Sequence, residues 1–243
     1  MSWFNPLPFD APKRCPRQIP KVVVPSFIGD EGIVLNLLCH EGTGSVVKDY
    51  SPYKNHGSVY GGVTWVDGPW GWALELDGSS GYLLVNDSPS LKNLSAVSVE
   101  IWINPILDGN AHDIVSKSRD NLDGSFWLRI RSYYDDIRFF VRIAGTNYGS
   151  PTHALVSGVW QHAVGVYDGS SLYLYYNGDL VGSSSAATGT LSTDEPLLIG
   201  RENVAGYEYY YSGMLALPRI YNLVLSPEEV KHHFESARTL FGV

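Results

Sequence analysis

The chain has 243 residues, 44% hydrophobic and 13% aromatic, which suits one large core with appendages better than two complete domains. Its formal net charge of -8 argues against sequence-independent nucleic-acid binding, because that activity needs a dense basic surface. Abundant glycine, proline and tyrosine, with only 17% charged residues, indicate short strands joined by tight turns. We find no secretory signal pattern and no apolar run near the roughly 20 residues of a membrane span.

Residues 1–27 are predicted to form an extended arm. They hold six of the fourteen prolines, and proline is excluded from helix interiors and central strands. We expect the arm to be held by the rest of the chain or by a neighbouring subunit, so it is a candidate for self-assembly. It contains Cys15, and Cys39 lies in the apolar run that follows. A disulfide between these cysteines and two separate thiols are both compatible with the sequence.

From Gly32 onward, apolar residues alternate with polar ones between turn signals, as expected for an antiparallel sandwich. The pattern is clearest in VSVEIWIN (97–104), SFWLRIR (125–131) and IRFFVRI (137–143). The predicted inward residues are Val97, Val99, Ile101, Ile103, Phe126, Leu128, Ile130, Ile137, Phe139, Val141 and Ile143.

Two local signals mark a hairpin and a helix near the end of the chain. In LYLYYNGDLVG (172–182), Asn177-Gly178 is the pair that a two-residue type I′ turn prefers. Further on, Ser226 is a predicted N-cap, with Pro227 at the first helical position and Glu229 completing a capping box. We therefore predict three parts along the chain: the arm at 1–27, the sandwich at 28–225, and a C-terminal helix and tail packed on it at 226–243.

Eight motifs, in order, resemble the laminin G-like branch of the concanavalin A-like lectin/glucanase superfamily between about Gly32 and Val230. They are CHEGTG (39–44), KDYSPYKNHG (48–57), GWALELDGSSGYLLV (71–85), VSVEIWINP (97–105), GVWQHAVGVYDG (158–169), LYLYYNGDLVG (172–182), LLIGRE (197–202) and RIYNLVLSPEEV (219–230). Each motif is weak alone and the combination is specific. The resemblance implies an all-β, two-sheet antiparallel jelly roll. That fold hosts lectins, adhesive modules, pentraxin-like binders and some polysaccharide-cleaving enzymes, so it narrows the function without deciding it.

The same resemblance raises the question of calcium. In the family, the late strand commonly carries two acids, and one often joins an early aspartate around a calcium ion. Here Ala216 and Leu217 stand at the two acid positions, which removes both charge and oxygen ligands. Asp49 and Asn55 remain as candidate calcium ligands. The alternative is that their segment is a turn held by side-chain hydrogen bonds to the backbone.

Catalysis has little support in the sequence. Glycosidases of this superfamily place carboxylates along one strand, and the nearest approach here is Glu75 and Asp77, which share a strand face. Asp77-Gly78 stands where the family has a structural turn, so a solvated carboxylate is the preferred interpretation. His162 lies in line with apolar residues and is expected to be a hydrogen-bonded core residue. His232 and His233 do not have the spacing of a metal-binding pair.

The outward residues of two central strands form the first predicted binding site. If the SYYDD segment (132–136) reverses the chain, these residues become neighbours across a hairpin and form a basic, aromatic patch suited to an acidic glycan. They are Trp127, Arg129, Arg131, Arg138, Phe140 and Arg142. The alternative is that these side chains only cover the sheet or pack on the arm.

Tyrosine-rich loops form the second predicted binding site. Tyr207, Tyr209 and Tyr210 lie in GYEYYY (206–211), and the segment with Tyr133 and Tyr134 is similar in character. Tyrosine offers a large contact area at modest entropic cost and is common in binding loops. The alternative is that the alternating tyrosines share one strand face as packing.

We weigh three functions. The first is a non-catalytic recognition module that binds a glycan or a protein surface, as a lectin or in adhesion. The second is a structural assembly protein, such as a virion decoration or surface protein, that contacts its neighbours through the arm. The third and weakest is a polysaccharide-cleaving enzyme. The absence of a signal pattern in the sequence leaves the location undecided between a cell surface and a virion.

Overall fold

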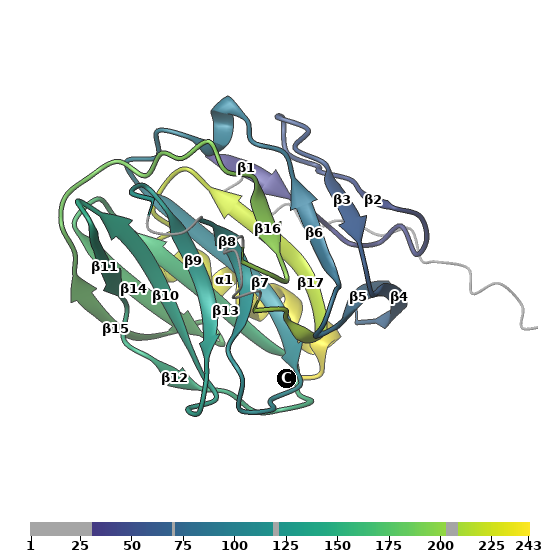
Figure 1. The fold of residues 1–243 in the computed structure, drawn as a ribbon. Coiled ribbons are helices and arrows are strands. Elements are labelled where there is room, and N and C mark those ends of the chain that lie inside the picture. The colour runs from purple at the N-terminus through teal and green to yellow at the C-terminus, as the bar shows by residue number, and fades with distance from the viewer. Residues whose placement is uncertain (1–30, 70, 119–121, 203–208) are drawn as a thin grey trace, which may run out of the picture.

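The computed structural model describes residues 31–69, 71–118, 122–202 and 209–243. These residues form two antiparallel sheets packed face to face, and a C-terminal helix lies on the outside of one of them (Figure 1). This confirms the predicted all-β jelly roll with its C-terminal helix. The predicted arm and its Cys15 lie outside the described residues. In the part of the chain that is described, no helix is long and apolar enough to cross a membrane.

The first sheet runs in the spatial order β15-β14-β13-β7-β17-β5-β4, and β1 also pairs with β17. Its strands are β1 (Ile33–Asn36), β4 (Val63–Gly68), β5 (Gly71–Asp77), β7 (Val97–Pro105), β13 (Gln161–Tyr167), β14 (Ser171–Tyr176), β15 (Asp179–Ser185) and β17 (Ser212–Tyr221). β5 pairs with the first half of β17 and β1 with its second half, on either side of an irregularity after Ala216.

The second sheet runs in the order β11-β10-β9-β8-β16-β6-β3-β2, and β12 also pairs with β10. Its strands are β2 (Val46–Val47), β3 (Gly57–Tyr60), β6 (Tyr82–Val85), β8 (His112–Lys117), β9 (Phe126–Arg131), β10 (Asp136–Ile143), β11 (Thr146–Gly149), β12 (His153–Ala154) and β16 (Leu197–Ile199). A short 3-10 helix, η1 (Pro89–Leu91), precedes β7.

The core fills the space between the sheets. Every inward residue predicted for β7, β9 and β10 is buried there, with at most 8% of its surface exposed. Gly165 in the middle of β13 has a packing reason, because a Cβ at this position would lie 2.4 Å from the ring of Phe139 in the facing sheet. The alternation of the sequence therefore predicted the inner faces correctly.

The hairpin and the helix caps follow the predicted local chemistry. Asn177 and Gly178 join β14 to β15 with φ angles of 47° and 80°, as a type I′ turn requires. Helix α1 (Pro227–Phe241) begins with the full capping box: the Ser226 hydroxyl accepts from the Glu229 N–H, and the Glu229 carboxylate accepts from the Ser226 N–H at 2.7 Å. These signals act over a few residues, so they can be predicted from the sequence.

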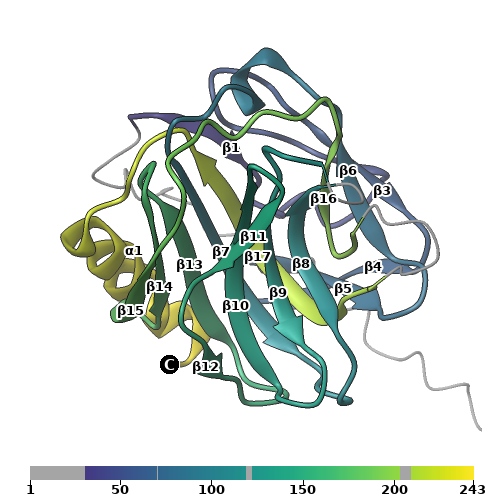
Figure 2. The ribbon, with the colours of Figure 1, turned by 60° about the vertical axis from the view of Figure 1, so that its left-hand side comes forward.

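Helix α1 forms a third layer on the outer face of the first sheet (Figure 2). Phe241 stacks on Trp102 of β7 at a centroid distance of 3.9 Å, and Phe234 stacks on the same ring at 5.8 Å. As a result, the polar residues that alternate outward along β7 are buried, including Glu100 with 1% exposure. His162 on β13 is also buried and hydrogen-bonds to Glu100 at 2.9 Å, as predicted for a core histidine.

Candidate functional site

Four connections meet at one end of the sandwich. The end of β5 lies beside the start of β17, through the pair Asp77–Ser212, and the end of β7 lies on the other side of β17, through Pro105–Gly213. The start of β8 pairs with the end of β9. The loops that leave these strand ends, at 78–81, 106–111 and 132–135, and the segment before β17 at 209–211, are therefore neighbours.

The β9–β10 turn presents an exposed tyrosine in a strained conformation. Tyr133 has a φ angle of 65°, a left-handed conformation that non-glycine residues rarely adopt. Its N–H donates to the Gly109 carbonyl at 2.9 Å, which ties the turn to the β7–β8 loop. The Tyr133 side chain is 90% exposed, and the adjacent Tyr134 is 67% exposed. Strain that displays an aromatic ring to solvent is a reason to suspect a binding role.

A pocket of about 370 Å³ opens between these loops. It is lined by Gly78, Asp108, Gly109, Asn110, Ala111, His112, Ser132, Tyr133, Tyr209 and Tyr210. Its volume is within the range of small-ligand sites, and its wall combines aromatic rings with a few polar groups.

His112 and Asp108 form the polar base of this pocket. The His112 Nδ1 lies 2.6 Å from the Tyr210 carbonyl, and its Nε2 lies 2.8 Å from Asp108 Oδ1. A carbonyl and a carboxylate are both acceptors, so each ring nitrogen of His112 lies within hydrogen-bond distance of an acceptor. Burial raises the pKa of Asp108, but the hydrogen bonds from Asn110 and His112 outweigh it and lower the pKa below its ordinary value.

Aromatic rings continue from the pocket across the second sheet. Tyr210 lies 6.4 Å from Tyr82, which stacks on Tyr60 at 5.1 Å. The Arg201 guanidinium lies over two of these rings, 4.8 Å from Tyr82 and 5.3 Å from Tyr210. We call this set the tyrosine surface; its members are Tyr60, Tyr82, Tyr133, Tyr134, Tyr209 and Tyr210.

Arg129 supports the tyrosine surface from the adjoining strand. Its guanidinium binds Asp113 through two hydrogen bonds of 2.8 Å, contacts Glu202, and lies 4.6 Å from the centre of the Tyr209 ring. Burial and the neighbouring Asp113 raise the pKa of Glu202 to about 7, although Arg129 lowers it in part. The arginine therefore fixes a ring of the pocket wall and has its charge compensated.

The predicted hairpin patch differs from expectation in two respects. The register does bring its members together, since Arg129 faces Arg138 and Trp127 faces Phe140. However, Trp127 is only 7% exposed and stacks on Phe140 at 5.2 Å, so it is not an open surface ring.

The arginines of that patch also have hydrogen-bond partners within the protein. Arg131 binds Asp136 through two hydrogen bonds, and Arg138 donates to the carbonyls of Gly149 and Ser150. Arg142 donates to Asn147 at 2.8 Å and has a carboxylate oxygen of Asp123 at 3.6 Å. The hairpin therefore assembles the predicted basic, aromatic patch, but its arginines have cross-strand partners that the alternation pattern does not reveal, and binding of an acidic glycan there stays a prediction.

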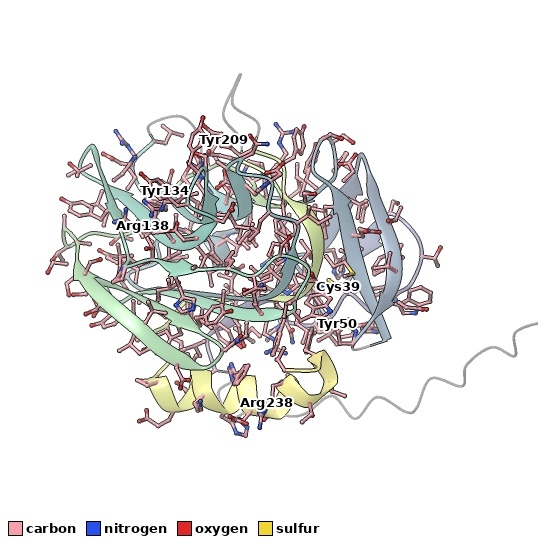
Figure 3. All side chains as sticks on the ribbon, turned by 90° about the horizontal axis from the view of Figure 1, so that it is seen from below. Cys39, Tyr50, Tyr134, Arg138, Tyr209 and Arg238 are labelled. Atoms are coloured by element: carbon pink, nitrogen blue, oxygen red, sulfur yellow. The ribbon has the colours of Figure 1, made fainter. Side chains whose placement is uncertain are left out.

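The second predicted site fits the geometry more closely. Tyr209 and Tyr210 line the pocket together with Tyr133, so segments almost 80 residues apart in sequence meet there. Tyr207 lies outside the described residues. Figure 3 shows Tyr134, Arg138 and Tyr209 on the side of the molecule away from α1. Sequence reasoning missed Asp108 and His112; the Asp-Gly-Asn turn that follows β7 is the signal that could have found them.

Asp49 and Asn55 do not fit a calcium ion as they are placed. Asp49 Oδ1 accepts from the N–H groups of Asn36 and Ser51, and its Oδ2 accepts from the Ser51 hydroxyl and the Asn55 N–H. The Asn55 side-chain amide donates to Val34 and Ser90. Four donors thus occupy the carboxylate, as in the turn alternative. Among the described residues, no group of three or more His, Cys, Asp or Glu side chains could hold a metal.

Of the two carboxylates weighed for catalysis, Glu75 is exposed and Asp77 has structural surroundings, as do the neighbouring acids Asp113 and Glu202. Asp77 accepts the N–H groups of Ser79, Ser80 and Gly81, and these bonds hold its pKa far below the ordinary value in spite of the opposing effect of burial. Asp113 and Glu202 are buried and both bind Arg129. Neither arrangement presents two carboxylates across an open cleft.

A second pocket of about 400 Å³ lies at the opposite end of the sandwich, near η1. It is lined by Tyr53, Pro89, Ser90, Lys92, Asn93, Leu94, Ser95 and Asn222. This pocket has a single aromatic ring in its described lining, whereas the first has several, so the first is the better candidate for a ligand that stacks.

Fold and site together define a lectin-like jelly-roll domain with an aromatic pocket in its loops. A family profile described as the concanavalin A-like lectin/glucanases superfamily matches residues 77–231. The chain belongs to this superfamily, as its motifs predicted. No curated protein matches the sequence significantly.

Solved structures with the same fold include bacterial toxin binding domains. The binding domain of Paraclostridial Mosquitocidal Protein 1 has a TM-score of 0.68 and 19% identity over 85% of this chain and 52% of the other. A botulinum neurotoxin type C structure, whose cell entry depends on two ganglioside molecules, has a TM-score of 0.70 and 14% identity over 86% and 52%. The binding domain of botulinum neurotoxin DC, in complex with rat synaptotagmin II, has a TM-score of 0.65 and 13% identity over 86% and 52%. This chain therefore spans about half the length of each.

Proposed function

We propose that this protein is a non-catalytic recognition module that binds carbohydrate through the tyrosine surface and its pocket. The observation that carries the proposal is Tyr133, a strained, 90% exposed ring at the rim of a pocket that Tyr209 and Tyr210 also line. Aromatic rings stack on the apolar faces of sugars, and nearby polar groups bind the hydroxyls.

The surroundings of the pocket support this proposal. Its turn is fixed by the hydrogen bond from Tyr133 to Gly109, and Tyr209 is held under Arg129, so part of the wall is ordered before a ligand arrives. Preorganisation lowers the entropic cost of binding. Two of the toxin structures with this fold concern a neurotoxin whose cell entry depends on gangliosides and a binding domain in complex with synaptotagmin II, which is consistent with a recognition role, and the chain corresponds to about half of each.

The proposal of a non-catalytic module is supported by the placement of the acids. Asp77 is bonded to three backbone N–H groups, and Asp113 is bonded to Arg129. A retaining or inverting glycosidase needs one carboxyl group to protonate the leaving group and a second carboxylate across the scissile bond. The described pocket contains one carboxylate, Asp108.

A glycan array followed by calorimetry tests the function. The test variant is Tyr133→Ala, and the matched control is Tyr53→Ala, an exposed tyrosine at the opposite pocket. We expect Tyr133→Ala to weaken binding about tenfold, from loss of one stacked ring, and Tyr53→Ala to leave it unchanged. Both variants should unfold within about 0.5 kcal/mol of the parent, because the rings are exposed. If no glycan binds, or if both variants bind equally well, the proposal is wrong.

Self-assembly through residues 1–27 stays a separate prediction. Light scattering on the full chain and on a chain lacking these residues would test it. A change from an oligomer to a monomer is the expected result, and an identical mass per particle for both would contradict it.

A further inference from the structure

The ring nitrogens of His112 and two of the N–H donors of Asn110 in the pocket lining already have partners. Both ring nitrogens of His112 are used, one by the Tyr210 carbonyl and the other by Asp108. The Asn110 backbone N–H and one side-chain N–H also donate to Asp108. A carboxylate or sulfate is recognised by charge-assisted bonds from available donors, and these groups do not supply them.

The charges around the pocket are also paired. Arg129 is paired with Asp113 and Glu202, Arg131 is paired with Asp136, and His112 lies against Asp108. No lysine or arginine is among the described residues that line the pocket. Arg201 lies over the rings of Tyr82 and Tyr210 and is not part of that lining. An anion entering here would therefore meet a carboxylate and no uncompensated lining cation.

The pocket does offer what an uncharged sugar needs. Asp108 Oδ1 accepts two hydrogen bonds, whereas Oδ2 accepts one from Asn110, so Oδ2 retains an acceptor position for a hydroxyl. The Asp108 side chain is 44% exposed and can be reached. Tyr133 on the same pocket supplies a ring face. A hydroxyl acceptor beside an aromatic face matches the alternating polar and apolar surfaces of a pyranose.

We propose that the pocket takes an uncharged saccharide ring, with Asp108 accepting a hydroxyl and Tyr133 stacking on the ring, and that it disfavours sialylated or sulfated sugars. This inference rests on the proposed function and names its ligand class. It reverses the acidic glycan expected from the arginines of the hairpin, because Arg129 and Arg131 are paired with carboxylates and Arg138 donates to backbone carbonyls.

Matched glycan pairs test the inference on the full chain. The array carries lactose with 3′-sialyllactose and 3′-sulfolactose, and other neutral cores each with its sialylated and sulfated forms. We expect the strongest signals from neutral members, with at least threefold weaker binding after an acidic group is added to the ring that enters the pocket. Calorimetry on the best neutral binder should show a loss of about tenfold in Tyr133→Ala.

Asp108→Asn separates charge from shape. The amide keeps the size of the side chain and removes the negative charge, so the ratio of neutral to acidic binding should fall about threefold or more. Asp194→Asn is the matched control: it makes the same change at an exposed aspartate that pairs with Lys92 of the opposite pocket, and it should leave that ratio unchanged.

The outcomes are distinguishable. Tighter binding of the acidic members, lost in Tyr133→Ala or Arg201→Gln, overturns this inference and leaves the proposed carbohydrate function standing. An unchanged ratio in Asp108→Asn also overturns it. An array without any binding, or neutral binding that ignores Tyr133→Ala, overturns the proposed function and this inference with it.

Discussion

The outer faces of both sheets carry polar and aromatic side chains, but these are buried on the first sheet and partly exposed on the second. On the first sheet, Glu100, Trp102 and His162 lie under α1, and none is more than 1% exposed. On the second sheet, the side chains of Arg129 and Arg131 are 20% and 29% exposed, and no helix covers them in the described structure. The same strand alternation thus produced one buried polar face, over which α1 lies (Figure 2), and one partly exposed face.

On the buried face, neighbouring polar groups replace water around the Glu100 carboxylate. Glu100 receives hydrogen bonds from His162 at 2.9 Å and Tyr221 at 3.2 Å, and it faces His233 at 3.1 Å and Arg219 at 3.5 Å. Burial alone would raise the pKa of Glu100, but Arg219 and these hydrogen bonds hold it well below the ordinary value. Burial lowers the pKa of His162, although the hydrogen bond between its Nε2 and Glu100 acts in the opposite direction.

The largest predicted effect comes from breaking the charge cluster under the helix. Arg219→Ala leaves the Glu100 carboxylate buried without its cation, and we expect a loss of about 3–5 kcal/mol in the free energy of unfolding. Urea denaturation measures it. The control Arg238→Ala removes an exposed arginine on α1 and should cost about 1 kcal/mol or less. Equal losses in both variants would show that the cluster does not differ energetically from a surface pair.

A second pair of variants compares aromatic packing on the two faces. Phe241 of α1 is 5% exposed and stacks on Trp102, so Phe241→Ala should cost about 3 kcal/mol. Phe140 on the second sheet stacks on Trp127 but is less buried, and Phe140→Ala should cost about 1–2 kcal/mol. Chemical denaturation of both variants tests the order. A larger loss for Phe140→Ala would contradict the conclusion that the outer face of the first sheet, which α1 covers, is the less solvent-exposed of the two.

The pH dependence sharpens the comparison on the second sheet. The pKa of Glu202 is raised from 4.5 to about 7 in the folded protein, so the folded state holds this proton more tightly than the unfolded state. The stabilisation is complete below pH 4.5 and is lost as the pH rises through 7. Glu202→Gln lacks this loss, so its stability relative to the parent should rise by about 2 kcal/mol between pH 5 and pH 8. Parallel pH profiles for the two proteins would count against the raised pKa.

The smallest expected effect concerns calcium. Because four donors occupy Asp49, adding calcium or a chelator should leave the thermal midpoint of the full chain unchanged. Asp49→Asn is a companion variant, and it should lower stability equally with and without calcium, through weaker hydrogen bonds in the turn. A midpoint that rises with calcium in the parent and not in Asp49→Asn would restore calcium binding at this turn.

Much of the fold could be predicted because its signals are local. The alternation of Ile137, Phe139 and Val141 assigns one strand face to the core, and Asn177-Gly178 selects its turn from two residues. Only part of the candidate site could be predicted from the sequence. Tyr209 and Tyr210 were singled out, but their meeting with His112 and Asp108 depends on which strand ends lie side by side.

The sequence by itself determined the strands, the turn chemistry, the helix caps and the superfamily, since each depends on spacing within a short segment or on motif order. The tertiary structure alone decided which outward residues are buried, which arginines are compensated, and where the tyrosines gather. Those properties depend on contacts between residues far apart in the chain. Trp127 shows the difference: the strand pattern places it on the outer face, and only its neighbours decide that 7% of it meets solvent.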